Sequence, residues 1–264
     1  MHQLVLAFLA FFVITSCAMA NPVSTSARSE LAPTAKLRVG INYGNFLLVT
    51  NYVPGTEPRG IAPDLGRELG RRLGVPVEIV AYDSVAVMGD AALAGAWDIA
   101  FLGSDPAREA LMSFTAAYLE IDATYLVPGA SALSTAAEVD REGIRVAAPA
   151  RANYELFLSR NLKRARLVST QCGDAAFDLL VTGKVDALAG LTQGLLGLAE
   201  KLPGSRIVEG RFLGVQQSIA VPRGRDAGLA YLRRLVEDAK ASGLVARAIE
   251  KTGARGVSVA PPAK

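Results

Sequence analysis

A short polar stretch after an apolar run combines residue types that can bind an anion. Residues 101–104 read Phe-Leu-Gly-Ser, and Asp105 and Pro106 then favour a helix start, because Asp caps helices and Pro suits the first helical position. Arg108 falls in the first turn, where the helix dipole disfavours a cation. An anion shared between the guanidinium and free backbone N–H groups would account for this arginine. The alternative is an ion pair with Asp105 or Glu109.

A second arginine follows another apolar strand pattern. Residues 145–148 predict a strand, Arg151 comes next, and Asn153 is a plausible cap for the following helix. Ligands of open α/β sheets bind outside the carboxyl ends of the strands. Two such ends that face each other would place Arg108 and Arg151 on opposite walls of one cleft. The alternative for Arg151 is an exposed turn residue.

The first strand pattern also ends in candidate ligand contacts. Residues 41–46 read Ile-Asn-Tyr-Gly-Asn-Phe, in which Gly44 permits a tight turn. Phe46 could stack on a ligand and Asn45 could contact it from the same turn. The alternative is that Phe46 packs in the core.

Histidine and cysteine are too scarce for several kinds of catalyst. The 264 residues include one histidine, His2, and two cysteines, Cys17 and Cys172. If about twenty N-terminal residues are removed, no histidine remains, which excludes a Ser-His-Asp triad, a Cys-His pair and a histidine-ligated zinc or iron site. The formal net charge of +3 does not favour nucleic acid as a partner. Cys172 is expected to be a small, partly buried side chain.

Residues 1–20 predict a signal peptide. Residues 4–14 form an apolar run that is too short to span a bilayer comfortably, and residues 18–20 provide a small-x-small cleavage site before Asn21. A buried N-terminal helix is one alternative. A lipoprotein signal is another, because residues 14–17 resemble a lipobox that ends in Cys17. We expect a secreted, periplasmic protein in which residues 21–35 form a flexible lead-in.

Two α/β units position the candidate residues. The first unit alternates strand and helix patterns over 36–118, with strands at 37–41, 77–82 and 98–102 and helices at 64–73 and 84–94. The second repeats this order over 122–212, with strands at 145–148, 166–170 and 187–191 and helices at 154–161 and 175–182. This alternation predicts mainly parallel sheets covered by helices.

Both units end a helix in the same way. Gly95 precedes Asp98 by three residues, and Gly183 precedes Asp186 by three residues. A glycine at a helix end followed by an Asp that opens a strand predicts two similarly built lobes. The C-terminal segment 218–256 adds two helices, and the Pro-rich tail 257–264 is expected to be disordered.

Short motifs recur in a fixed order along residues 36–253. They are Leu-Arg-Val-Gly at 37–40, Gly-Ile-Ala-Pro-Asp-Leu at 60–65, Leu-Ala-Gly-Ala-Trp-Asp at 93–98, Asp-Pro-Ala-Arg at 105–108 followed by Phe-Thr at 114–115 and Tyr118, Gly-Lys-Val-Asp-Ala at 183–187, and Lys-Ala-Ser-Gly at 240–243. With the predicted signal peptide, this ordered set resembles the periplasmic solute-binding proteins of amino-acid-type ABC transporters, solute-binding protein family 3.

The resemblance implies an α/β fold with a two-lobed periplasmic-binding-protein (type II) architecture. Two crossing segments, placed at 119–121 and 213–217, would join lobe 1 (residues 36–118 and 218–256) to lobe 2 (residues 122–212). A ligand between the lobes would favour the closed form by contacting both walls. An ABC permease in the inner membrane would recognise that form. We expect a monomer with no cofactor, no metal and no nucleic-acid partner.

The resemblance also shows where this chain departs from its family. Arg108 matches the arginine that grips the ligand carboxylate, which suits a planar, bidentate donor. Asp105 stands where the family has a threonine, which leaves Ser104 as the hydroxyl, and Arg151 stands in the usual Gly-Ser/Thr pair. Leu191 stands where the family aspartate holds the ligand ammonium. A buried ammonium without a counter-charge is costly, so a standard α-amino acid is disfavoured.

We therefore expect a non-catalytic receptor for a small carboxylate-bearing solute, an organic acid more than a zwitterion. The expected ligand contacts come from both walls of the cleft: Asn45, Phe46, Ser104, Asp105, Arg108, Arg151 and Asn153. One alternative is a dehydratase-like enzyme on the same fold that acts on cyclic carboxylates, with Asp105 as its acid. Another is a sensory binding protein that presents its ligand to a receptor instead of a permease.

Overall fold

The computed structural model describes residues 23–45, 47–50, 53 and 55–263. The predicted signal peptide, the lipobox with Cys17, and Phe46 lie outside the described residues. None of the helices in the described ranges is both long enough and apolar enough to cross a membrane.

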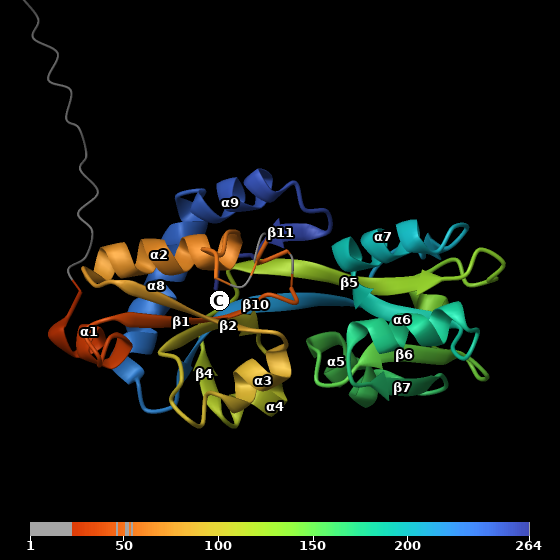
Figure 1. Cartoon of the computed structure of the whole chain (residues 1–264), viewed down its shortest axis with the longest axis horizontal. Coiled ribbons are helices and arrows are strands. Elements are labelled where there is room, and N and C mark those ends of the chain that lie inside the picture. The colour runs from red at the N-terminus through yellow and green to blue at the C-terminus, as the bar shows by residue number, and fades with distance from the viewer. Residues whose placement is uncertain (1–22, 46, 51–52, 54, 264) are drawn as a thin grey trace, which may run out of the picture.

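One mixed sheet runs through the whole molecule (Figure 1). Its strands follow the order β2-β1-β3-β10-β5-β8-β6-β7, with β4, β9 and β11 paired off this path. The strands are β1 (Leu37–Asn42), β2 (Val77–Tyr82), β3 (Ile99–Gly103), β4 (Met112–Phe114), β5 (Leu119–Val127), β6 (Arg145–Pro149), β7 (Arg166–Thr170), β8 (Ala187–Leu191), β9 (Arg206–Ile207), β10 (Leu213–Pro222) and β11 (Val257–Val259).

Helices cover the sheet in both lobes (Figure 1). They are α1 (Thr25–Leu31), α2 (Ile61–Leu73), α3 (Val85–Asp90), α4 (Pro106–Glu109), α5 (Asn153–Asn161), α6 (Gly173–Val181), α7 (Thr192–Lys201), α8 (Asp226–Ala241) and α9 (Leu244–Thr252), with a 3-10 turn at Ala136–Glu138. The predicted two-lobed α/β architecture is confirmed, with α2, α8 and α9 on lobe 1 and α5, α6 and α7 on lobe 2.

Parallel strands form the core of each lobe. In lobe 1, β1 pairs with β2 and β3, and α2 buries Leu65, Leu69 and Leu73 against them, because residues four apart share one helix face. In lobe 2, β6 pairs in parallel with β7 and β8. The alternation of strand and helix patterns therefore specifies the same unit twice.

The two units share one Arg–Asp arrangement at equivalent positions. The guanidinium of Arg38 on β1 donates to both carboxylate oxygens of Asp98 and to the carbonyl of Gly95. The guanidinium of Arg145 on β6 does the same with Asp186 and Gly183. Each glycine has a φ in the left-handed region, 61° at Gly95 and 67° at Gly183. Gly183 directly follows the cap of α6, as the sequence predicts, whereas α3 ends at Asp90 and Gly95 lies in the turn after it.

The two predicted crossing segments lie beside each other. β5 and β10 pair antiparallel from Leu119↔Gln217 to Ala123↔Leu213, which includes residues 119–121 and 213–217. β10 continues into lobe 1, where it pairs with β3, and β5 continues into lobe 2, where it pairs with β8. These two strands therefore carry the chain between the lobes (Figure 1).

The structure differs from the sequence predictions at both ends. Residues 25–31 of the predicted flexible lead-in form helix α1, which Ser24 caps and whose Leu31 is fully buried against lobe 1. Residues 257–259 of the tail predicted to be disordered form β11, which pairs with β5. The helix predicted over 84–94 ends at Asp90. Cys172 is exposed and not partly buried.

Candidate ligand-binding site

Arg108 lies between the two lobes and is 9% exposed. Asp105 caps the short helix α4 by accepting from the Ala107 amide at 2.9 Å, which fixes Arg108 in its first turn as predicted. Nη1 of Arg108 donates to the Gly103 carbonyl at 2.6 Å within lobe 1. Nη2 reaches into lobe 2 and donates to the Arg151 carbonyl at 2.7 Å.

The partners of Arg108 are neutral. They are two backbone carbonyls and the side-chain oxygen of Asn153, and among the described residues Arg108 makes no ion pair. Burial lowers the pKa of the Arg108 guanidinium to about 10, the charge of Asp105 opposes this shift, and the charge of Arg151 adds to it. The alternative prediction, an ion pair of Arg108 with Asp105 or Glu109, is therefore wrong.

Asn153 connects both lobes through its amide. The helix cap is Ala152 and not Asn153 as predicted, because Asn153 is the first residue of α5 and its side chain points away from its own helix start. Its Nδ2 donates to the Ser104 carbonyl at 2.8 Å, and its Oδ1 accepts from Arg108. A Cβ at Gly103 would lie 2.5 Å from that Oδ1, so this close approach requires glycine.

Asp105 has a partner that the sequence did not indicate. Its carboxylate is 5% exposed and forms an ion pair with Arg160 of lobe 2, with 2.6 Å between Arg160 Nη2 and Asp105 Oδ2. Arg160 lies on α5, seven residues after Asn153. Residues seven apart lie on one face of a helix, so the spacing of Asn153 and Arg160 is the sequence feature that could have placed Arg160 at the site.

Arg151 has a left-handed backbone, with a φ of 64°. Its guanidinium donates to both carboxylate oxygens of Asp90 in lobe 1, at 3.0 and 2.7 Å, and this contact lowers the pKa of Asp90. Its amide donates to the buried carboxylate of Glu155 at 2.9 Å, which also accepts from the Ser169 hydroxyl. Arg151 is an exposed residue of a turn, which was the alternative prediction for this position. Its ion pair with Asp90 also joins lobe 2 to lobe 1.

Asn45, another predicted ligand contact, is not among the hydrogen-bond partners of Arg108. The side chain of Asn45 accepts from the Leu47 amide and stabilises its own turn. Leu191 ends β8 next to α7 and packs against the lobe 1 core cluster, so an apolar side chain occupies the position of the family aspartate. In the described part of the chain, no group of three or more His, Cys, Asp or Glu residues is placed to hold a metal ion.

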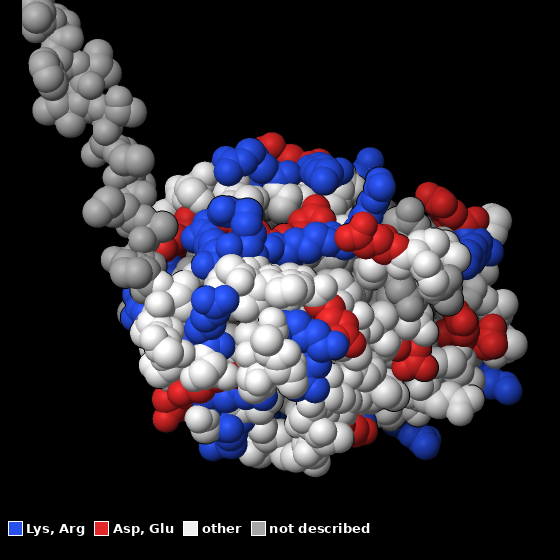
Figure 2. All heavy atoms as spheres, turned by 60° about the vertical axis from the view of Figure 1, so that its left-hand side comes forward, with Lys and Arg blue, Asp and Glu red and all other residues white. Residues whose placement is uncertain are grey.

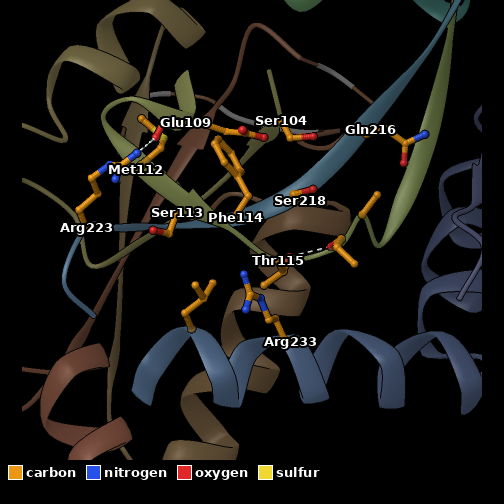
Figure 3. Close-up of a pocket in the computed structure, with 13 residues that line it drawn as sticks. Ser104, Glu109, Met112, Ser113, Phe114, Thr115, Gln216, Ser218, Arg223 and Arg233 are labelled. Atoms are coloured by element: carbon orange, nitrogen blue, oxygen red, sulfur yellow. Dashed lines mark hydrogen bonds between the residues drawn. The ribbon is translucent and has the colours of Figure 1, made fainter. Parts of the chain in front are cut away.

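A groove of about 460 Å³ lies next to this site on lobe 1 (Figure 3). Ser104, Gln216 and Ser218 line one part of it. Arg233 rises from α8 toward Thr115 on the other, and Phe114 lies between these parts (Figure 3). Ser104 lines the groove and also accepts a hydrogen bond from Asn153 across the lobes.

On the face of lobe 1 that Figure 2 shows, Lys and Arg side chains gather in a band with Asp and Glu side chains beside them. The arginines of α2 have acidic partners, because Arg71 and Arg72 both pair with Glu68 and Arg67 pairs with Asp64. Mutually paired charges create little net field, so this face does not indicate a nucleic-acid surface.

Comparison with protein families gives one match that covers most of the chain. The model of the bacterial extracellular solute-binding proteins, family 3, matches residues 37–254. A comparison with curated protein sequences found no significant match.

Solved structures with the same fold come from several kinds of binding protein. A mutant of ArgBP from T. maritima is 22% identical with a TM-score of 0.70, and the match covers 86% of this chain and 99% of that one. The ancestral amino acid-binding protein AncCDT-1, a precursor of cyclohexadienyl dehydratase, is 21% identical with a TM-score of 0.70, covering 85% and 97%. The BvgS periplasmic VFT2 domain of Bordetella pertussis is 19% identical with a TM-score of 0.73, covering 86% and 97%. At these identities the likeness establishes the fold.

Proposed function

Because the chain belongs to the bacterial extracellular solute-binding proteins, family 3, we propose that it is an extracytoplasmic receptor for a small carboxylate-bearing solute. The solute is captured between the lobes and delivered to an ABC importer. Ligand capture favours lobe closure when the ligand contacts both walls. The receptor itself is non-catalytic and needs no cofactor.

The observation that carries this proposal is the buried guanidinium of Arg108. A cation this deeply buried is normally paired with an anion, because neutral acceptors compensate only part of the lost hydration. Arg108 has only neutral acceptors among the described residues. A solute carboxylate at the guanidinium would supply the missing negative charge through charge-assisted hydrogen bonds.

The same cleft supports an organic acid over an α-amino acid. The acids near Arg108 are already engaged, since Asp105 pairs with Arg160 and Asp90 pairs with Arg151. Leu191 provides no carboxylate at the position where the family aspartate would hold an ammonium. AncCDT-1 is described as an amino acid-binding protein, and we propose that this chain differs from it in its ligand.

Isothermal titration calorimetry against a library of amino acids and organic acids tests the proposal. We expect micromolar or tighter binding of at least one organic acid that lacks an α-amino group, at roughly −8 kcal/mol or below. Tight binding of an ordinary α-amino acid would refute the preference for an organic acid. Failure of every carboxylate in the library would refute the carboxylate receptor.

A dehydratase-like enzyme is the competing proposal, because AncCDT-1 is a precursor of such an enzyme. Its acid would be Asp105. The carboxylate of Asp105 both caps α4 and pairs with Arg160, so it is held in two structural contacts instead of being free to transfer a proton. Turnover of a cyclohexadienyl substrate would establish the enzyme.

Presentation of the ligand to a sensory receptor is the second competing proposal. The BvgS domain shares the fold, which a sensor and a transport receptor can both use. Copurification with a permease and ATPase would support transport, and copurification with a sensor kinase would support sensing.

We also propose that residues 1–20 direct export and are then removed. The mass of the purified exported protein tests this step. A start at Asn21 is expected, whereas a lipidated start at Cys17 would show a membrane-anchored lipoprotein.

A further inference from the structure

Two ion pairs join the lobes directly, and both have the same polarity. Lobe 1 supplies the acids, Asp90 at the end of α3 and Asp105 at the start of α4. Lobe 2 supplies the bases, Arg151 before α5 and Arg160 near its end. The distances are 2.7 Å from Arg151 Nη2 to Asp90 Oδ1 and 2.6 Å from Arg160 Nη2 to Asp105 Oδ2.

We propose that the Asp90–Arg151 and Asp105–Arg160 ion pairs form an electrostatic latch that favours the closed arrangement of the lobes. This inference concerns the regulation of the proposed binding site and rests on the proposed function. The equilibrium between open and closed lobes then depends on the chain's own charges as well as on a solute. Ionic strength becomes a control on access to Arg108.

The two pairs contribute differently. The side chains of Asp90 and Arg151 are 62% and 53% exposed, so salt screens this pair strongly. The Asp105 side chain is 5% exposed and that of Arg160 is 44% exposed, so salt screens this pair less than the other one. Loss of Arg160 would leave the Asp105 carboxylate buried and unpaired in the closed form, which favours opening because opening hydrates the carboxylate.

Hydrogen bonds to backbone carbonyls complete the latch on the same side of the lobes. The amide of Asn153 donates to the Ser104 carbonyl, and Arg108 donates to the Arg151 carbonyl. All of these lobe 2 groups lie on α5 or in the turn before it. One rigid element of lobe 2 therefore carries the whole latch, and separation of α5 from lobe 1 breaks every contact together.

The test compares the full chain with latch variants by small-angle X-ray scattering and hydrogen exchange. Arg160→Gln removes the cation that pairs with the buried Asp105 carboxylate. Asp105→Asn removes the ion pair from the other side and preserves the helix cap, because Asn caps as well as Asp. We expect a larger radius of gyration for both variants and faster amide exchange at residues 103–105, 107 and 150–155. The matched control is Glu78→Gln, which breaks the Lys36–Glu78 ion pair within lobe 1 and should change neither measurement.

Exchange of the two charges of the Asp90–Arg151 pair separates a loss of attraction from a general effect of substitution. Arg151→Asp alone should open the lobes, and Asp90→Arg with Arg151→Asp should close them again, because Asp tolerates the left-handed φ at position 151. We also expect the wild-type radius of gyration to increase between 50 mM and 1 M NaCl. Unchanged scattering and exchange in folded Arg160→Gln and Arg151→Asp variants would overturn the latch.

These outcomes are independent of the proposed function. The latch is measured by lobe separation, with no solute added. The receptor is measured by calorimetry. If the variants open but calorimetry finds no carboxylate that binds, the latch proposal stands and the proposed function is refuted.

Discussion

The guanidinium of Arg108 donates to the backbone carbonyl of Arg151 across the cleft, at 2.7 Å. The sequence places these two arginines after equivalent strands. In the structure, the Arg108 side chain contacts the backbone oxygen of Arg151, and the two guanidinium groups do not line the cleft as a matched pair. The left-handed backbone of Arg151 belongs to this geometry, because its φ of 64° sets the direction of the peptide groups around it. A solute carboxylate at Arg108 would take hydrogen bonds that now join the lobes.

Removal of the Arg108 guanidinium should weaken solute binding. We expect Arg108→Ala to bind the carboxylate found by calorimetry roughly 10- to 150-fold more weakly, because a hydrogen bond to a charged group contributes about 1.5–3 kcal/mol. Arg108→Lys should recover only part of the loss, since an ammonium lacks the planar fork. Arg164→Lys, at an exposed position, is the control. Normal binding by Arg108→Ala would show that the carboxylate is held elsewhere.

A carboxylate at position 191 should create affinity for amino acids. Leu191 has an extended backbone, with φ −72° and ψ 137°, at the cap position of α7, and Asp is a favoured cap there. We therefore expect Leu191→Asp to fold and to bind α-amino acids at least tenfold more tightly than the wild type, through a charged hydrogen bond to the ammonium. Calorimetry with the amino-acid library measures this gain. Leu191→Asn provides the same cap without the charge, so equal affinity in the two variants would contradict the assignment.

Glycine should relieve the backbone strain at Ala35. Its φ of 62° is left-handed, which costs a residue with a Cβ roughly 1–2 kcal/mol, part of which the greater freedom of glycine in the unfolded chain offsets. We expect Ala35→Gly to raise the free energy of unfolding by about 0.5–1 kcal/mol in urea titrations. Ala130→Gly, at an exposed position without a left-handed φ, should lower it. Destabilisation by Ala35→Gly would show that the turn is not strained.

The two equivalent Arg–Asp arrangements should differ in their contribution to stability. Asp98 has a fully buried side chain that pairs with Arg38 and Arg225, whereas the Asp186 side chain is 34% exposed. Asp98→Asn should lower the free energy of unfolding by about 3–5 kcal/mol, because it leaves arginines facing a neutral group in the interior. Asp186→Asn should lower it by about 1 kcal/mol or less. Equal losses in urea titrations would contradict the role of burial.

Local patterns predicted the parts of the fold that depend on neighbours in sequence. The cap at Asp105, the helix end at Gly183 and the repeated α/β unit all follow from side chains within a few residues. The helix end predicted at Gly95 was wrong, because α3 ends at Asp90. Helix α1 was missed because its Ala- and Ser-rich sequence has no strong period, and packing of Leu31 against lobe 1 stabilises it.

The candidate site was predicted only in part, because its contacts depend on how the lobes meet. Arg108 and Asn153 were identified from their strand ends, and their mutual contact spans 45 positions in sequence. Asp90 carried no local sign of a site, and Arg160 carried only its spacing of seven residues from Asn153. Asp90 meets Arg151, and Arg160 meets Asp105, only when lobe 2 lies against lobe 1. No periodic pattern contains that information.

The ion pairs on α2 should make stability depend on acid pH. The Glu68 carboxylate accepts hydrogen bonds from Arg71 and Arg72, and the contact with Arg71 is the main cause that lowers its pKa from 4.5 to about 2. A pKa that is lower in the folded protein than in the unfolded chain stabilises the fold above pH 4.5, and this contribution is lost as the pH falls toward 2.

Comparison with Glu68→Gln isolates that contribution. We expect the difference in unfolding free energy between wild type and Glu68→Gln to be largest at pH 7 and to shrink as the pH falls from about 4.5 toward 2. Urea titrations at several pH values measure the difference, and NMR detection of the Glu68 carboxyl carbon should give a midpoint of about 2. In Arg71→Gln with Arg72→Gln, the midpoint should return toward its ordinary value because both donors are gone. A difference that stays constant with pH would show that the two arginines do not stabilise the Glu68 carboxylate.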